Sequence, residues 1–136
     1  MFDPLPIALS GDREIIARAE ALRREIEAHA EVIERDRRLP LALLDKLHEA
    51  RLFRLLLPRS VDGIETDPIT FFHVVETIAR GDASAAWCVS QSGGCATSAA
   101  YLDPAAAHEI FGQPHAMLAW GPGPQGKAVE IGRAHV

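Results

Sequence analysis

The sequence predicts an all-α domain over residues 1–113, followed by the first hairpin of a β-domain over residues 114–129. This prediction rests on two observations. Apolar residues recur at intervals of three and four through most of the chain, which is the spacing of one helix face. An Asp-Pro pair also stands at two points where such a run begins, as expected for a helix N-cap followed by proline in the first turn.

The first two helices are predicted from apolar spacing and from a proline. One long amphipathic helix is expected from Asp12 to Arg38, with charged residues on its outer faces. Its apolar face consists of Ile15, Ala19, Leu22, Ile26 and Ile33. A second helix is expected to have Pro40 at its first position and leucines on one face. A short apolar segment ending at Pro58 and a loop over residues 59–66 follow.

Three further helices are predicted from their capping residues. Asp67-Pro68 begins the third, which Gly81 is expected to end, and Asp82 can cap the fourth. Asp103-Pro104 begins the fifth, which ends near Gly112. Residues 115–120 then fit a strand, and a Gly/Pro turn leads to a second strand from Lys127. Because a lone hairpin is not a stable sheet, further strands are expected to follow.

Charge and polarity argue against two kinds of partner. The net charge is -5 and the basic residues alternate with acidic ones, so a nucleic-acid partner is not expected. Residues 83–102 carry no charge, but their several Ser, Thr and Gln side chains favour a helix buried in protein over a membrane span. Cys88 and Cys95 would lie about 10 Å apart along one helix, too far for a disulfide. With no signal peptide at the N-terminus, a reducing cytoplasmic location is expected.

Several segments together resemble the N-terminal domain of the acyl-CoA dehydrogenase superfamily. They are Glu34-Arg-Asp-Arg-Arg-Leu-Pro40, the segment from Leu47 to Pro58, the Asp62-Gly63 loop, Ala79-Arg-Gly-Asp-Ala-Ser-Ala-Ala-Trp87, Leu102-Asp-Pro104 and the segment from Trp120 to Ala128. Within that superfamily the chain is most similar to the two-component flavin-dependent monooxygenases of aromatic compounds. The resemblance implies a flavin cofactor, FAD or FMN. It also implies an N-terminal helical bundle, a middle β-domain and a C-terminal four-helix bundle.

The last seven residues do not follow the family pattern. The family would continue after Val129 with a strand and a Gly-Gly-Tyr-like turn, whereas this chain has Glu130-Ile-Gly-Arg-Ala-His-Val136. These residues can be encoded by DNA that reads like a sequencing adapter. We therefore expect a truncated chain in which residues 130–136 are a non-native tail; an ordinary tail is the alternative.

The cofactor candidates lie in a glycine-rich turn. Gly121-Pro-Gly-Pro-Gln-Gly126 matches the dinucleotide pattern G-x-G-x-x-G, but its prolines have no N–H for a pyrophosphate and no helix signature follows, so a Rossmann site is rejected. In the resembling family this turn lies against the flavin. That analogy makes cofactor-binding candidates of Ala119, Trp120, Gly121, Gly126 and Lys127. A plain hairpin turn is the alternative.

The substrate candidates lie on the fourth helix. Trp87, Gln91 and Cys95 form one stripe at intervals of four, which the family analogy places partly beside the substrate and the flavin. The small residues of this helix, Gly93 and Gly94 among them, allow close approach of a neighbouring helix or a flat ring. In several monooxygenase relatives, a His that orients the substrate hydroxyl stands where this chain has Cys95. A thiol is a weak donor, so hydroxylation by that arrangement is in doubt.

The resemblance implies part of a flavin-dependent oxidoreductase. Its reaction would be CH–CH oxidation of an acyl-CoA or hydroxylation of an aromatic compound, in a homo-oligomer (a homotetramer), with a flavin reductase as partner in the second case. The catalytic residue is unknown and is expected beyond the chain end, so the chain alone is expected to be inactive. The histidines form no metal-binding pattern. The alternative is a non-enzymatic helical interaction module.

Overall fold

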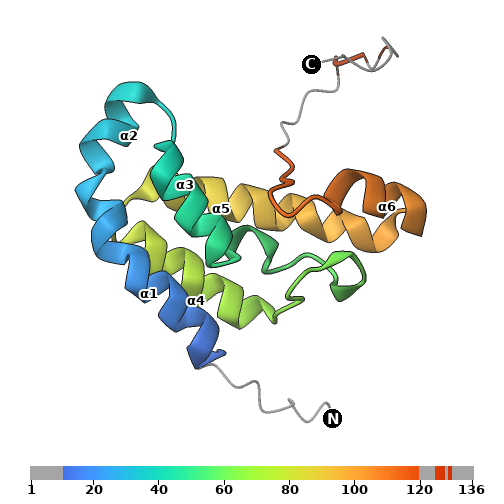
Figure 1. The fold of residues 1–136 in the computed structure, drawn as a ribbon, viewed down its shortest axis with the longest axis horizontal. Coiled ribbons are helices and arrows are strands. Elements are labelled where there is room, and N and C mark those ends of the chain that lie inside the picture. The colour runs from blue at the N-terminus through green and yellow to red at the C-terminus, as the bar shows by residue number, and fades with distance from the viewer. Residues whose placement is uncertain (1–10, 120–124, 128, 130–136) are drawn as a thin grey trace, which may run out of the picture.

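A computed structural model describes residues 11–119, 125–127 and 129. Within these residues the fold is helical, which confirms the all-α prediction (Figure 1). The α-helices are α1 (Arg13–Ala28), α2 (Ala30–Asp36), α3 (Leu41–Glu49), α4 (Pro68–Ala79), α5 (Ala83–Ala96) and α6 (Pro104–Phe111). Short 3-10 helices connect them: η1 (Leu52–Arg54), η2 (Arg59–Val61) and η3 (Thr97–Tyr101).

Helices α1, α4 and α5 form the centre of the fold. α1 and α4 lie side by side and point the same way, as Figure 1 shows. At their N-terminal ends, the Asp12 N–H donates to Thr70 Oγ1 over 2.7 Å. At their C-terminal ends, a Cβ on Gly81 would lie 2.8 Å from the Arg23 carbonyl oxygen, so α1 approaches the α4–α5 turn closely. That turn reverses the chain, and α5 packs antiparallel along α4.

Two hydrophobic clusters stabilise the described residues. The larger cluster lies between α1, α3, η1, α4 and α5, and its fully buried members include Ile26, Leu43, Leu47, Val74 and Ile78. The smaller cluster joins η2, the end of α5, η3 and α6. It contains Leu57, Val61, Ala96, Ala99, Ala107 and Phe111.

The predicted caps are confirmed at the helix N-termini. The Asp67 carboxylate accepts from the N–H groups of Ile69 and Thr70, and Pro68 follows as the first helical residue. Asp82 and Asp103 each accept from one N–H at α5 and α6, and Asp12, which was not predicted as a cap, accepts from two at α1. Each such cap stabilises its helix by about 1 kcal/mol.

The single helix predicted for residues 12–38 was wrong, because the structure divides it at His29. There, Nδ1 of the His29 ring lies 2.8 Å from the Glu25 carbonyl oxygen, and the backbone N–H of His29 is shared between the carbonyls of Glu25 and Ile26. This local bonding competes with the regular helical ladder. Pro40 also differs from expectation, since it precedes α3 as its N-cap residue.

The predicted strand over residues 115–120 is not seen in the part that the structure describes. Residues 115–119 form a turn followed by chain without regular secondary structure. A strand needs a ladder partner, and the described residues offer none. The remainder of the predicted hairpin falls largely outside the described residues. Among the helices that are described, none is long and apolar enough to cross a membrane.

Candidate functional site

A groove of about 670 Å³ lies between α3, α5 and the segment that follows α6. Its described lining residues are Arg38, Leu39, Leu41, Leu44, Phe53, Trp87, Cys88, Gln91, Ser92, Met117, Leu118 and Ala119. Most of these are apolar, and Arg38 is the one charged side chain among them. The volume is within the range of about 300–1,000 Å³ that small-molecule sites occupy.

Helix α5 supplies two of the three substrate candidates to this groove. Trp87 and Gln91 lie one turn apart on the same face, and Trp87 is 65% exposed. Cys95, one turn further, is 8% exposed and does not line the groove. Of the three residues predicted to form one stripe on α5, two therefore line the groove.

The side-chain oxygen of Gln91 has an unusual environment. Oε1 is buried, and no hydrogen-bond donor among the described residues reaches it. Buried polar atoms of native proteins nearly always have a partner, because an unpaired acceptor loses its hydration without compensation. Gln91 Oε1 is thus an unsatisfied acceptor in the wall of the groove.

Cys88 and Ser92 form a second row on α5 that the sequence analysis missed. They stand one position after Trp87 and Gln91 and therefore share the same four-residue spacing, which is the signal that could have found them. Burial raises the pKa of the Cys88 thiol, and the charge of Asp82 raises it further. The thiol is protonated at neutral pH, so Cys88 contributes a weakly polar surface and not a nucleophile.

The opposite wall comes from α3 and its approach. Leu39, Leu41, Leu44 and Phe53 line it, and Leu41 remains 77% exposed. The sequence analysis predicted leucines on one face of this helix but did not identify this wall. Leu43 and Leu47, which lie on the inner side of the same helix, do occupy the core.

The third wall is the segment after α6, and Arg54 fixes where that segment begins. Arg54 is 3% exposed and its guanidinium donates to five backbone carbonyls. Two of these, of Asp62 and Val61, are close in sequence, at 3.0 and 2.6 Å. The other three belong to Phe111, Gln113 and Pro114, at 3.0, 3.1 and 3.3 Å. Arg54 thereby holds the chain that leads into Met117, Leu118 and Ala119.

An aromatic stack also contacts this segment, through His115. The His115 ring stacks on the His48 ring with centroids 4.4 Å apart, and His48 also contacts Phe53 at 4.8 Å. Burial lowers the pKa of His48, and the nearby His115 lowers it further. The stack thus favours a neutral His48 behind the groove wall.

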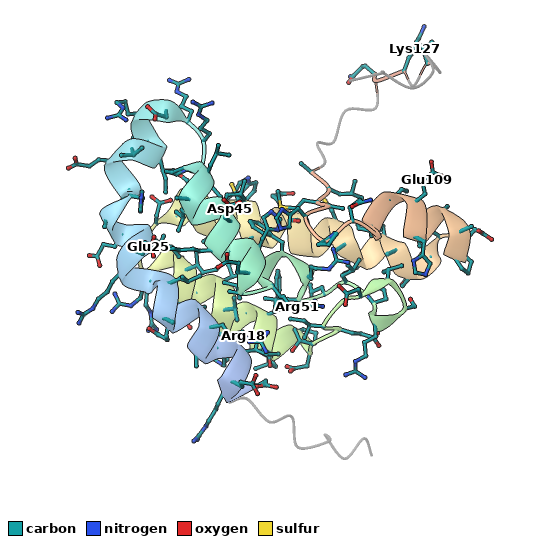
Figure 2. The ribbon with its side chains drawn as sticks, viewed as in Figure 1. Arg18, Glu25, Asp45, Arg51, Glu109 and Lys127 are labelled. Carbon is teal, nitrogen blue, oxygen red and sulfur yellow. The ribbon has the colours of Figure 1, made fainter. Side chains whose placement is uncertain are left out.

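The described cofactor candidates do not all lie at the groove. Ala119 lines the groove that Trp87 and Gln91 also line. Gly126 and Lys127 are exposed and without regular secondary structure, and Lys127 lies apart from the helices in Figure 2. Trp120 and Gly121 lie outside the described residues. The described residues also contain no cluster of His, Cys, Asp or Glu that could hold a metal ion.

Comparison with known proteins adds one finding to this geometry. The family model described as the acyl-CoA dehydrogenase N-terminal domain matches residues 13–108, a span that runs from the start of α1 into α6. No curated protein matches the chain.

Proposed function

Because the chain belongs to the acyl-CoA dehydrogenase family, a family of flavin-dependent oxidoreductases, we propose that its groove is the N-terminal wall of a flavin-dependent active site. The main support for this proposal is that a single groove contains both a cofactor candidate and substrate candidates. Ala119, a cofactor candidate, shares one groove with Trp87 and Gln91, the substrate candidates. These residues come from segments far apart in the sequence.

The groove fits a flat, largely apolar ring. Its walls are leucines, Phe53 and Trp87, and its volume of about 670 Å³ accommodates a ring system together with a small substrate. Trp87 offers an exposed aromatic surface for such a ring to pack against. The single cation among the described lining residues, Arg38, does not make a pyrophosphate site.

The chain's own residues would bind and orient the substrate and would exclude water from the groove. Trp87, Leu44 and Phe53 would cover the reacting ring with apolar surface, and Gln91 would supply the polar contact. The flavin, when bound, supplies the redox chemistry. The substrate would be an acyl-CoA that is oxidised at a CH–CH bond or an aromatic compound that is hydroxylated. Cys95 does not line the groove, so it is not placed to orient a substrate hydroxyl there, and both reactions remain candidates.

The same proposal extends to the setting of the whole protein. We propose a homo-oligomeric enzyme in the reducing cytoplasm, where the free thiols of Cys88 and Cys95 persist. A flavin reductase would be a partner only for the hydroxylating reaction. The choice between FAD and FMN depends on residues outside the groove described above.

The test begins with the gene downstream of the Val129 codon. The longer product should carry a flavin absorbance spectrum, and Trp87→Ala in it should lower kcat/KM about tenfold to a hundredfold, because a large aromatic contact is lost. Phe72→Ala is the matched control, since Phe72 is also exposed, at 63%, but lies on α4 outside the groove. A native stop codon after Val136 and no flavin binding would instead favour the interaction module.

A further inference from the structure

The groove contains one polar atom whose environment indicates a missing partner. Gln91 Oε1 is buried and has no donor among the described residues, although Ser92 and Cys88 lie beside it on α5. The terminal amide torsion of glutamine is soft, so the oxygen can turn toward the groove without any movement of the helix. A ligand group that donates to it would remove the cost of the unpaired acceptor.

We infer that Gln91 is a specificity-determining residue, whose side-chain carbonyl selects groove ligands that carry an O–H or N–H donor on an apolar body. This inference rests on the proposed function, since it assigns a substrate class to the same groove. The surrounding leucines, Phe53 and Trp87 define the apolar body, and the unsatisfied oxygen defines the donor. A ligand without a donor leaves the oxygen unpaired and gains only the apolar contacts.

The chemistry around Gln91 supports a neutral donor. The thiol of Cys88 stays protonated because burial raises its pKa, so it does not compete as an anionic acceptor. Arg38 is exposed and lines both this groove and a second hollow, which Cys88 and Leu39 also line. Arg38 therefore belongs to the wall formed by the approach to α3, whereas Gln91 belongs to the α5 wall.

The test compares two probes of nearly equal shape on the 136-residue chain. p-Cresol carries a hydroxyl where p-xylene carries a methyl group, and binding of each is followed by amide NMR shifts of α5 and residues 117–119. We expect p-cresol to bind about tenfold to a hundredfold more tightly than p-xylene. Gln91→Met keeps the side-chain length without the carbonyl and should abolish the difference by weakening p-cresol alone. Gln113→Met, at an exposed glutamine outside the groove, should preserve it.

Each result has a distinct meaning. If both probes bind equally to the unaltered chain, or if Gln91→Met keeps the preference for p-cresol, the role of Gln91 is overturned while the groove stands. If neither probe shifts the signals of the groove, the proposed function of the groove fails together with the inference. Thermal unfolding gives an independent measurement: Gln91→Met should raise Tm or leave it unchanged, because an unpaired acceptor is removed, and a clear fall in Tm would contradict the inference.

Discussion

At the residue scale, His48 links the charge state of one ring to the stability of the groove wall. Burial lowers its pKa in the fold and the proximity of His115 lowers it further, against a weaker opposite effect of Asp45. A histidine with a depressed folded pKa contributes stability above its unfolded pKa, about 6.5, and that stability is lost as the pH falls toward the folded pKa. We therefore expect the free energy of unfolding to decline as the pH falls below about 6.5.

The variant His48→Phe isolates this effect. Phenylalanine keeps a ring against His115 and Phe53 but does not titrate, so chemical denaturation at pH 7 and pH 5 should show a smaller pH-dependent loss than in the unaltered chain. His108→Phe, at an exposed histidine on α6, should leave the loss unchanged. An unchanged pH dependence in His48→Phe would show that other groups account for it.

Some of the residues that line the groove could be predicted from the sequence and others could not. Trp87 and Gln91 follow from helical spacing together with a family analogy, and both line the groove. Cys95 fits the same spacing but is buried and does not line the groove. The sequence around Arg54 did not indicate its role in fixing the groove wall, because three of its acceptors lie 57 to 60 residues further along the chain.

At the element scale, the paired glycines of α5 have different surroundings. A Cβ on Gly93 would lie 2.6 Å from the Phe71 ring on α4, whereas a Cβ on Gly94 would meet nothing within 4 Å. Gly93→Ala should therefore destabilise the chain by about 1–3 kcal/mol through overpacking. Gly94→Ala should stabilise it by up to about 1 kcal/mol, since alanine favours helix. Chemical denaturation measures both, and a similar effect of the two variants would contradict this packing.

The helices show which element boundaries a sequence determines. The starts of α4, α5 and α6 were predicted correctly because an aspartate side chain caps each through its own nearby N–H groups. The division between α1 and α2 was missed because Ile26 and Ile33 keep their apolar spacing across it and both remain buried. Periodicity therefore reports the buried face and is insensitive to a local break such as that at His29.

At the scale of the whole molecule, the two hydrophobic clusters are connected through a buried cation. The larger cluster holds α1, α3, α4 and α5, while the smaller one holds η2, η3 and α6. Arg54 lies in η1, which is part of the larger cluster. Its guanidinium donates hydrogen bonds to backbone carbonyls at the end of α6 and just after it. Without that guanidinium these carbonyls would lose their shared partner, and the third wall of the groove would lose its anchor.

Native-state hydrogen exchange tests this connection. The amides of α6 should open with a lower free energy than those of α4, because α6 belongs to the smaller cluster. Arg54→Met should lower the opening free energy of α6 by about 2–3 kcal/mol more than that of α4, because buried carbonyls lose their donor. Arg59→Met, at an exposed arginine of η2, should change neither. A uniform loss across all helices would show that Arg54 stabilises the chain as one unit, whereas a loss confined to α6 would show that the groove wall can detach while the central helices stay folded.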